Sequence, residues 1–273
     1  MEVMVVMEVM VVDDDKDMCN LYELNLIELG YKVSVFYFLF WLYAKALMQR
    51  DPTTLIFHIL QPFLITTYQQ KIFSIVMDFA RSAQIKGDYL EFGSYDGLSA
   101  TLAYHFSRRS GNMKMHLYCF DSFEGLPKIT EIDKTKGIFF KKGEYSCTQN
   151  LFEKNIKRRG VDTRFVTIIP GWYENTLNTE TKKKLPLTKA SVILIDCDLY
   201  ASTVEVLAFL TDYIEDGTVI IFDDWFNFSG NPEYGEQRAF REWLARNPEI
   251  TATEYHKVGW SINSFILHKK ENI

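Results

Sequence analysis

Residues 89–100 read Tyr89-Leu90-Glu91-Phe92-Gly93-Ser94-Tyr95-Asp96-Gly97-Leu98-Ser99-Ala100. The apolar residues from Tyr89 to Phe92 predict a short buried strand, and residues 97–106 predict a helix that packs back on it. Gly93 and Gly97 fall where a chain leaving a parallel strand turns sharply and lets a ligand approach the backbone without a Cβ in the way. The segment therefore predicts a ligand-binding turn.

An acidic residue precedes the first glycine of this turn. Glu91 gives the spacing E-x-G-x-x-x-G, which differs from the dinucleotide fingerprint G-x-G-x-x-G. A carboxylate at this place repels a pyrophosphate but suits a cofactor with a cationic amino-acid end. S-adenosylmethionine has such an end and NAD does not, so we expect S-adenosylmethionine as the cofactor.

The composition limits the class of protein. With 273 residues, 47% of them hydrophobic, the chain is one large domain or one domain with an appendage. The net charge of -6 argues against a nucleic-acid partner, because phosphate contacts need clustered Lys and Arg. No C-x-x-C pair is present, so we expect reduced thiols and a cytoplasmic protein; the cysteines are Cys19, Cys119, Cys147 and Cys197.

The N-terminal part has its own character. Residues 1–17 contain the hexapeptide MEVMVV twice and then an acidic run, which predicts a low-complexity tail without a secretory signal. Residues 18–85 predict a helical extension. Its apolar segment 33–44 is shorter than the roughly 20 residues of a membrane span, so we expect a helix buried against the domain or against a second subunit of a homo-oligomer. An interfacial or spanning helix is the alternative.

Residues 86–273 alternate strands and helices, which predicts a Rossmann-like, doubly wound α/β fold with a mostly parallel sheet. A closing strand pair is expected across Gly259-Trp260. The predicted strands are 89–92, 115–120, 164–169, 191–195, 218–222, 251–258 and 261–268, and the predicted helices are 97–106, 147–159, 201–214 and 236–247.

In such a sheet, ligands bind at the carboxyl ends of the strands. The second predicted strand ends in Asp121-Ser122, where an acid is placed to accept hydrogen bonds from ribose hydroxyls. The third strand runs into Gly171-Trp172, which offers a tight turn and an aromatic wall for an adenine. These residues extend the predicted cofactor site beyond the first turn.

Carboxylates gather at the ends of the fourth and fifth predicted strands. Asp196, Asp223 and Asp224 should lie close together there, and crowded carboxylates repel one another unless a cation holds them. All-oxygen ligation favours a hard ion, Mg²⁺ first and Mn²⁺ or Ca²⁺ as alternatives. Helix N-capping by Asp198 or Asp224 is the competing structural interpretation.

Five motifs in succession resemble the TylF family of macrocin-type O-methyltransferases, which are class I S-adenosylmethionine-dependent methyltransferases. The resemblance runs from about Gly87 to Phe240. The motifs are Glu91-Phe92-Gly93-Ser94-Tyr95-Asp96-Gly97, Phe120-Asp121-Ser122-Phe123-Glu124-Gly125-Leu126-Pro127, Pro170-Gly171-Trp172, Asp196-Cys197-Asp198-Leu199-Tyr200-Ala201-Ser202-Thr203 and Asp223-Asp224-Trp225.

The resemblance implies an enzyme that methylates a hydroxyl of a small molecule, a sugar or a glycosylated compound, with a divalent metal at Asp196, Asp223 and Asp224. Residues 143–146 resemble a family segment that closes over the cofactor. The cofactor-binding residues it implies are Glu91, Gly93, Ser94, Tyr95, Gly97, Ser99, Asp121, Ser122, Gly171 and Trp172.

The general base stays open, because Leu199 stands where catechol-type metal methyltransferases have a lysine. Asp196 is our candidate catalytic residue, and a histidine such as His256 is the alternative. Two other functions are weighed: a Mg²⁺-dependent nucleotide-sugar glycosyltransferase that uses the D-x-D of residues 196–198, and a non-catalytic scaffold. Residues 128–142 and 226–234 carry no signature that identifies the acceptor.

Overall fold

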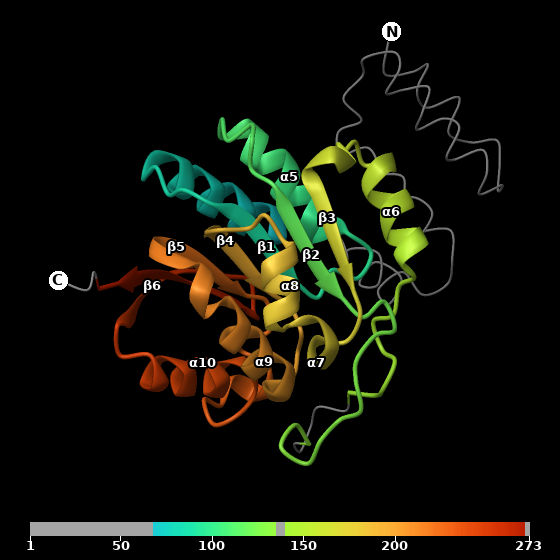
Figure 1. Ribbon diagram of the computed structural model, residues 1–273. Helices are drawn as coiled ribbons and strands as arrows, with labels where there is room; N and C mark the ends of the chain where they lie inside the picture. Colours follow the sequence, from blue (N-terminus) through green and yellow to red (C-terminus); the bar gives the residue numbers. More distant parts are fainter. Residues whose placement is uncertain (1–67, 135–139, 271–273) are drawn as a thin grey trace, which may run out of the picture. The chain divides into compact units, whose positions relative to one another are not determined.

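The computed structural model describes residues 68–134 and 140–270 (Figure 1). The predicted tail, the apolar segment 33–44 and most of the predicted helical extension lie outside the described residues. The described end of that extension is helical over residues 68–82. Within the part of the chain that the structure describes, none of the helices has the length and apolar character needed to span a membrane.

Seven strands form one sheet in the order β3-β2-β1-β4-β5-β7-β6 (Figure 1). The first five strands in sequence pair in parallel, and β7 is antiparallel to both β5 and β6. This confirms the predicted doubly wound, mostly parallel sheet and its closing strand pair. The strands are β1 (Asp88–Phe92), β2 (Leu117–Asp121), β3 (Val166–Pro170), β4 (Ala190–Ile195), β5 (Ile214–Phe222), β6 (Ile250–Val258) and β7 (Ile262–Lys269).

Helices cover both faces of the sheet, because alternate strand residues are apolar on both sides. One face packs against α9 and α10, and Leu90 and Phe92 of β1 point to it. The other face packs against the helix over residues 68–82, α5 and α6, and Tyr89 points to it. The helices are α5 (Leu98–Arg109), α6 (Gln149–Arg158), α7 (Tyr173–Thr176), α8 (Thr179–Lys184), α9 (Tyr200–Leu210) and α10 (Gly235–Arg246).

The end of α9, predicted at residue 214 and observed at Leu210, and the start of β5 depart most from the sequence-based boundaries. We predicted residue 218 as the start of β5, but the strand begins at Ile214 and contains a bulge, in which Gly217 has a φ of 89°. Val219 then resumes the ladder opposite Val192, and the Thr218 hydroxyl donates to the Ala190 carbonyl at 2.7 Å. The short helices α7 and α8 were not predicted, since four and six residues are too few for a periodic pattern.

Candidate active site

The carboxyl ends of four neighbouring strands lie level with one another. The parallel ladder continues one residue past each strand: Gly93 N donates to Phe120 O at 3.0 Å, and Asp196 N donates to Phe92 O at 2.9 Å. Asp223 N in turn donates to Ile195 O at 3.0 Å. The first residues after β1, β4 and β5 therefore form one row along the edge of the sheet, and Asp121 ends β2 beside them.

The two glycines of the first turn have a structural requirement that the sequence did not reveal. Gly93 has a φ of 89°, and a Cβ there would lie 1.7 Å from the carbonyl oxygen of Asp196. Gly97 has a φ of 81°, and a Cβ there would lie 2.5 Å from Ile156 on α6. Gly93 thus lets the tips of β1 and β4 approach closely, and Gly97 lets α5 start against α6. Their contact with a cofactor stays a prediction.

Asp121 organises the loop between β1 and α5. Its Oδ2 accepts hydrogen bonds from Ser94 N at 2.7 Å and Tyr95 N at 2.9 Å, and its Oδ1 accepts from Phe123 N at 2.6 Å. This carboxylate therefore joins the tips of β1 and β2. Binding of a ribose by Asp121 stays a prediction, and any hydroxyl must share the oxygens with these backbone donors.

Glu91 is a fully buried acid on β1. Its Oε2 accepts a hydrogen bond from the Tyr89 hydroxyl at 2.6 Å, whereas Oε1 is buried without a hydrogen-bond partner. Burial raises the pKa of Glu91 to about 7, although the nearby hydroxyls of Tyr89, Ser94 and Ser99 act to lower it. The Ser94 hydroxyl is a second buried group without a partner. An acceptor and a hydroxyl left unpaired together fit the ammonium group of an amino acid.

The other predicted cofactor residues surround this turn. Ser99 lies in the first turn of α5 and is buried. The Ser122 hydroxyl donates to Gly125 O and accepts from Glu124 N, both at 3.1 Å, so it closes its own turn. Gly171 N donates to Asp121 O at 2.9 Å, which places the following residue, the half-buried Trp172, next to the tip of β2.

Two exposed tyrosines meet above the loop. Tyr95 and Tyr145 lie edge to face, with ring centroids 6.4 Å apart. Both have a positive φ, 43° and 58°, which is uncommon for a residue with a side chain. Tyr145 belongs to the segment 143–146, which is held by hydrogen bonds between Leu126 and residues 143–144. The segment therefore reaches the β1–α5 turn, and its closure over a cofactor stays a prediction.

The predicted carboxylate group is present and is larger than expected. Asp198 N donates to Asp224 Oδ2 at 3.2 Å, and Asp224 N donates to Glu236 Oε2 at 3.1 Å. Protein atoms surround most of each carboxyl group, although the four aspartates keep some contact with solvent. The acid cluster, as we call this group, consists of Asp196, Asp198, Asp223, Asp224 and Glu236.

Burial raises the pKa of every member of the acid cluster, and repulsion from neighbouring carboxylates adds to this effect for all members except Asp223. For Asp196, burial and then the charges of Asp223 and Asp224 place the pKa well above the usual range of an aspartate. The pKa of Asp198 is raised to about 7 and that of Asp223 to about 6, in both cases chiefly by burial. None of the ion pairs among the described residues involves a member of the acid cluster, so no Lys or Arg of residues 68–134 and 140–270 neutralises it.

Asp198 and Asp224 do not cap helices, so that interpretation is wrong. The N-cap of α9 is Leu199, which has no side-chain cap. Asp198 instead has a φ of 59° at the centre of a tight turn that Leu199 N closes on Cys197 O at 2.6 Å. Asp224 accepts from Asn227 Nδ2 at 2.8 Å within the loop that follows β5.

The carboxylates of the acid cluster have the chemistry of metal ligands, but their arrangement does not form a metal site. Carboxylate oxygens suit a hard cation, but both oxygens of Asp224 already accept hydrogen bonds. Across residues 68–134 and 140–270, no three His, Cys, Asp or Glu side chains are arranged to hold a metal ion. The metal ligation predicted for Asp196, Asp223 and Asp224 therefore has no support from the geometry.

The structure adds site residues that no sequence motif indicated. Glu236 opens α10 and is 1% exposed, with Oε1 buried and unpartnered. Tyr173 follows Trp172, and burial together with the charges of Cys197, Asp121 and Asp196 raises its pKa well above the usual value. The sequence signal for Tyr173 was its place next to Gly171-Trp172. His256, the alternative base, is exposed on β6, and β7 separates that strand from β5.

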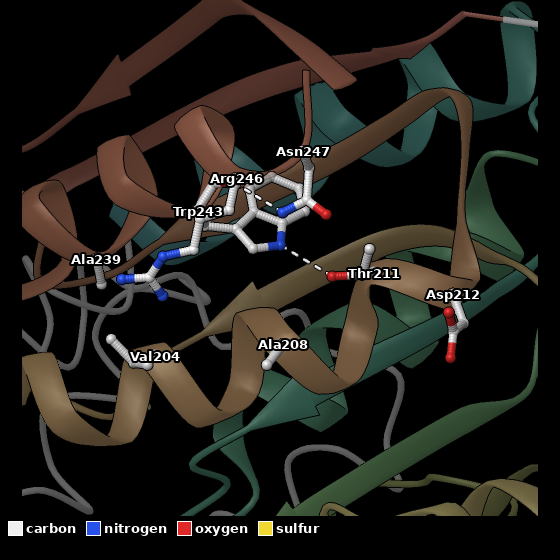
Figure 2. A pocket seen from close by; sticks show the side chains of 8 residues that line it. All are labelled: Val204, Ala208, Thr211, Asp212, Ala239, Trp243, Arg246 and Asn247. Atoms are coloured by element: carbon white, nitrogen blue, oxygen red, sulfur yellow. Dashed lines mark hydrogen bonds between the residues drawn. The ribbon is translucent and has the colours of Figure 1, made fainter. Parts of the chain in front are cut away.

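A recess between α9 and α10 lies away from the strand tips (Figure 2). Its volume is about 310 Å³, and Thr211 and Asp212 line it at the end of α9 that leads into β5. Trp243 Nε1 donates to Thr211 Oγ1 at 2.9 Å, a hydrogen bond that joins the two helices. The recess is therefore a seam between helices at the amino end of β5, opposite the acid cluster.

The sheet order, the glycine turn after β1 and the acids at the tips define the class as a Rossmann-like, class I methyltransferase fold. The profile of the macrocin O-methyltransferases (TylF) matches residues 67–260, and the chain belongs to this family. The family resemblance inferred from the five motifs is confirmed.

Curated relatives of known activity match about half of the chain. A tetracenomycin-type 4'-O-methyltransferase from Streptomyces olivaceus, named for a dimethoxy-rhamnosyl substrate, is 28% identical over 52% of this chain and 54% of its own length. The mycinamicin III 3''-O-methyltransferase of Micromonospora griseorubida is 26% identical over 52% of this chain and 56% of its own. The chain thus spans about half the length of these relatives.

Two solved structures share the fold. The O-methyltransferase NovP has a TM-score of 0.61 at 20% identity, and the match covers 73% of this chain and 79% of the NovP chain. A calicheamicin methyltransferase has a TM-score of 0.62 at 17% identity, and the match covers 86% of this chain and 93% of the methyltransferase chain. At these identities the likeness establishes the architecture alone.

Proposed function

We propose that this protein is an S-adenosylmethionine-dependent O-methyltransferase that acts on a sugar hydroxyl of a glycosylated small molecule. One observation carries the proposal: a buried, half-satisfied acid at the tip of β1 lies next to an acid cluster at the tips of β4 and β5 that no described Lys or Arg neutralises. Family membership supports methyl transfer, and the names of the two curated relatives support a glycosylated acceptor.

In this proposal, residues at the tips of β1, β2 and β3 bind the methyl donor. Glu91 and the unpaired Ser94 hydroxyl bind the ammonium end of the methyl donor, and Asp121 orients its ribose. Trp172 forms a wall beside the adenine. Methyl transfer needs an in-line approach of oxygen, carbon and sulfur, so holding donor and acceptor in place supplies much of the rate enhancement.

The acid cluster receives the proton of the acceptor hydroxyl. Asp198 suits this step because its pKa of about 7 allows it to accept a proton near neutral pH. Asp196, our candidate catalytic residue, is coupled to Asp198 through mutual repulsion, so the proton belongs to the cluster as a whole. We assign Asp198 as the first acceptor and Asp196 as the group that shares the charge.

A divalent cation is a separate part of the proposal. Asp196, Asp223 and Asp224 would hold it, and a bound cation would make the hydroxyl more acidic. Repulsion within the acid cluster supports this part, because a cation would relieve it. The cytoplasmic location is also proposed, and Cys119, Cys147 and Cys197 support it as free thiols.

Calorimetry and a transfer assay test the proposal. We expect S-adenosylhomocysteine to bind the full chain, and labelled S-adenosylmethionine to methylate at least one member of a panel of rhamnosylated natural products. Preferential binding of a nucleotide sugar would instead favour a glycosyltransferase. Binding of neither ligand would favour a scaffold.

The metal is tested by chelation and by one variant with its control. We expect EDTA to abolish transfer, Mg²⁺ to restore it, and Asp223→Ala to abolish the Mg²⁺-dependent transfer while affinity for S-adenosylhomocysteine stays within about twofold. Asp216→Ala is the control, because Asp216 is an exposed aspartate at the other end of β5. Full activity in EDTA would contradict the metal and leave methyl transfer intact.

A further inference from the structure

A buried aspartate ties the loop between β2 and α6 to the start of α9. Asp133 is 3% exposed, and its Oδ1 accepts a hydrogen bond from Tyr200 N at 2.7 Å, across 67 positions of sequence. Its Oδ2 accepts from the Thr130 hydroxyl at 2.9 Å. The backbone N–H of Ala201 also lies near this carboxyl group and acts to lower its pKa. Asp133 therefore acts as the N-cap that α9 lacks locally.

Tyr200, whose backbone N–H binds Asp133, is also held by side chains of α10. The Tyr200 hydroxyl donates to Glu242 Oε2 on α10 at 2.7 Å. The Arg238 guanidinium lies over the Tyr200 ring, 4.6 Å from its centre, and Arg238 Nε is 2.9 Å from Glu242 Oε1. Tyr200 thus joins the β2–α6 loop, α9 and α10, so the contact with Asp133 is part of a rigid junction.

This junction begins two residues after Asp198. The turn at Asp198 has an unfavourable positive φ and is held on one side by the hydrogen bond from its N–H to Asp224. The fixed start of α9 holds the other side. Because aspartate is a preferred N-cap residue, the free N–H groups of α9 would attract the Asp198 carboxylate if Asp133 did not occupy them.

We propose that Asp133 is a positioning residue for methyl transfer. By capping α9 from the β2–α6 loop, it fixes the turn that holds Asp198 beside Asp224 and couples the placement of that loop to the tip of β4. The inference about Asp198 rests on the proposed function. The cap itself does not, so the two can be tested separately.

The cap is tested by hydrogen exchange, which needs no acceptor. In Asp133→Ala, the amides of Tyr200 and Ala201 should exchange about fivefold faster or more, and residues 126–134 should lose protection with them. Asp133→Asn keeps one carbonyl oxygen for Tyr200 N, so it should restore part of the protection. The control is Asn178→Ala, which removes an ordinary local cap from α8, where Asn178 Oδ1 accepts from Thr181 N at 3.0 Å.

Positioning is tested with the glycoside that the wild-type enzyme methylates. We expect Asp133→Ala to lower kcat about 10- to 100-fold while affinity for S-adenosylhomocysteine stays within about twofold, with partial recovery in Asp133→Asn. Asn178→Ala should lose stability to a similar degree and keep its kcat.

Two results would overturn the proposal. Unchanged exchange at Tyr200 and Ala201 in Asp133→Ala would show that Asp133 does not cap α9, whatever the reaction. Faster exchange with an unchanged kcat would make Asp133 a structural cap only. If the wild-type protein methylates nothing, the proposed function fails, and the exchange data still decide the cap.

Discussion

Replacement of Glu91 by glutamine should make the protein more stable at high pH. Glu91 is fully buried, and its pKa rises from 4.5 to about 7 on folding. The folded state therefore binds more protons than the unfolded state between these values. The stability that this carboxyl contributes is present below pH 4.5 and is lost as the pH rises to about 7.

The size of the effect follows from the two pKa values. At about 1.4 kcal/mol per pKa unit, the ionised carboxyl costs the folded state about 3 kcal/mol above pH 7, and about 2.5 kcal/mol of this develops between pH 5 and pH 8. Glutamine is neutral at every pH and can still accept the hydrogen bond of Tyr89. The difference in unfolding free energy between Glu91→Gln and wild type should therefore grow by that amount, in favour of the variant.

Urea unfolding at pH 5, 6, 7 and 8 measures this difference, with the exposed Glu174→Gln on α7 as the control. The control should differ from wild type by the same small amount at every pH. Calorimetry should show that Glu91→Gln binds S-adenosylhomocysteine at least about tenfold more weakly at pH 8, because an amide cannot pair with an ammonium group. A stability difference between Glu91→Gln and wild type that does not change with pH, or that shifts in favour of wild type as the pH rises, would refute the reasoning.

Two further predictions concern the tips of β1 and β2. Gly93→Ala should cost at least about 3 kcal/mol of stability by urea unfolding, since its Cβ would meet a backbone carbonyl at 1.7 Å. Gly111→Ala has a similar φ of 91° but its nearest neighbour is at 3.5 Å, so it should cost only about 1 kcal/mol, and equal losses would contradict the clash. Asp121→Asn should lose about 2 kcal/mol and its affinity for S-adenosylhomocysteine, because an amide cannot accept from all three backbone donors; unchanged values for both would contradict that role.

The sheet could be predicted because its strands are buried apolar runs with clear punctuation. The segments 89–92 and 191–195 lie within one residue of the observed β1 and β4. The start of β5 was missed because the bulge at Gly217 interrupts the apolar pattern while the chain keeps its place in the sheet. The row of site residues was also accessible from sequence, since the residue after a parallel strand must lie at its carboxyl end.

The contacts that hold the site residues in place could not be predicted, because they join segments that are distant in the sequence. Asp133 caps a helix that starts 67 residues later, and Glu236 holds the backbone of Asp224 across 12 residues. Neither residue belongs to a motif. The local interpretation of Asp198 as a helix cap was wrong for the same reason: Asp133 already occupies the position that Asp198 would take.

The way the site acids are held explains why they can serve a ligand. Among the described residues, Asp121, Asp224 and Glu236 are bound by backbone N–H groups of neighbouring strand tips and not by Lys or Arg. A backbone donor fixes the position of a carboxylate without cancelling its charge, whereas an ion pair would do both. No described Lys or Arg compensates the negative charge along this edge, and the raised pKa values of Glu91 and Asp198 express chiefly the cost of burying it. A ligand that brings positive charge to this edge recovers that cost on binding, which is why a cationic methyl donor fits the site better than a nucleotide sugar with its anionic diphosphate.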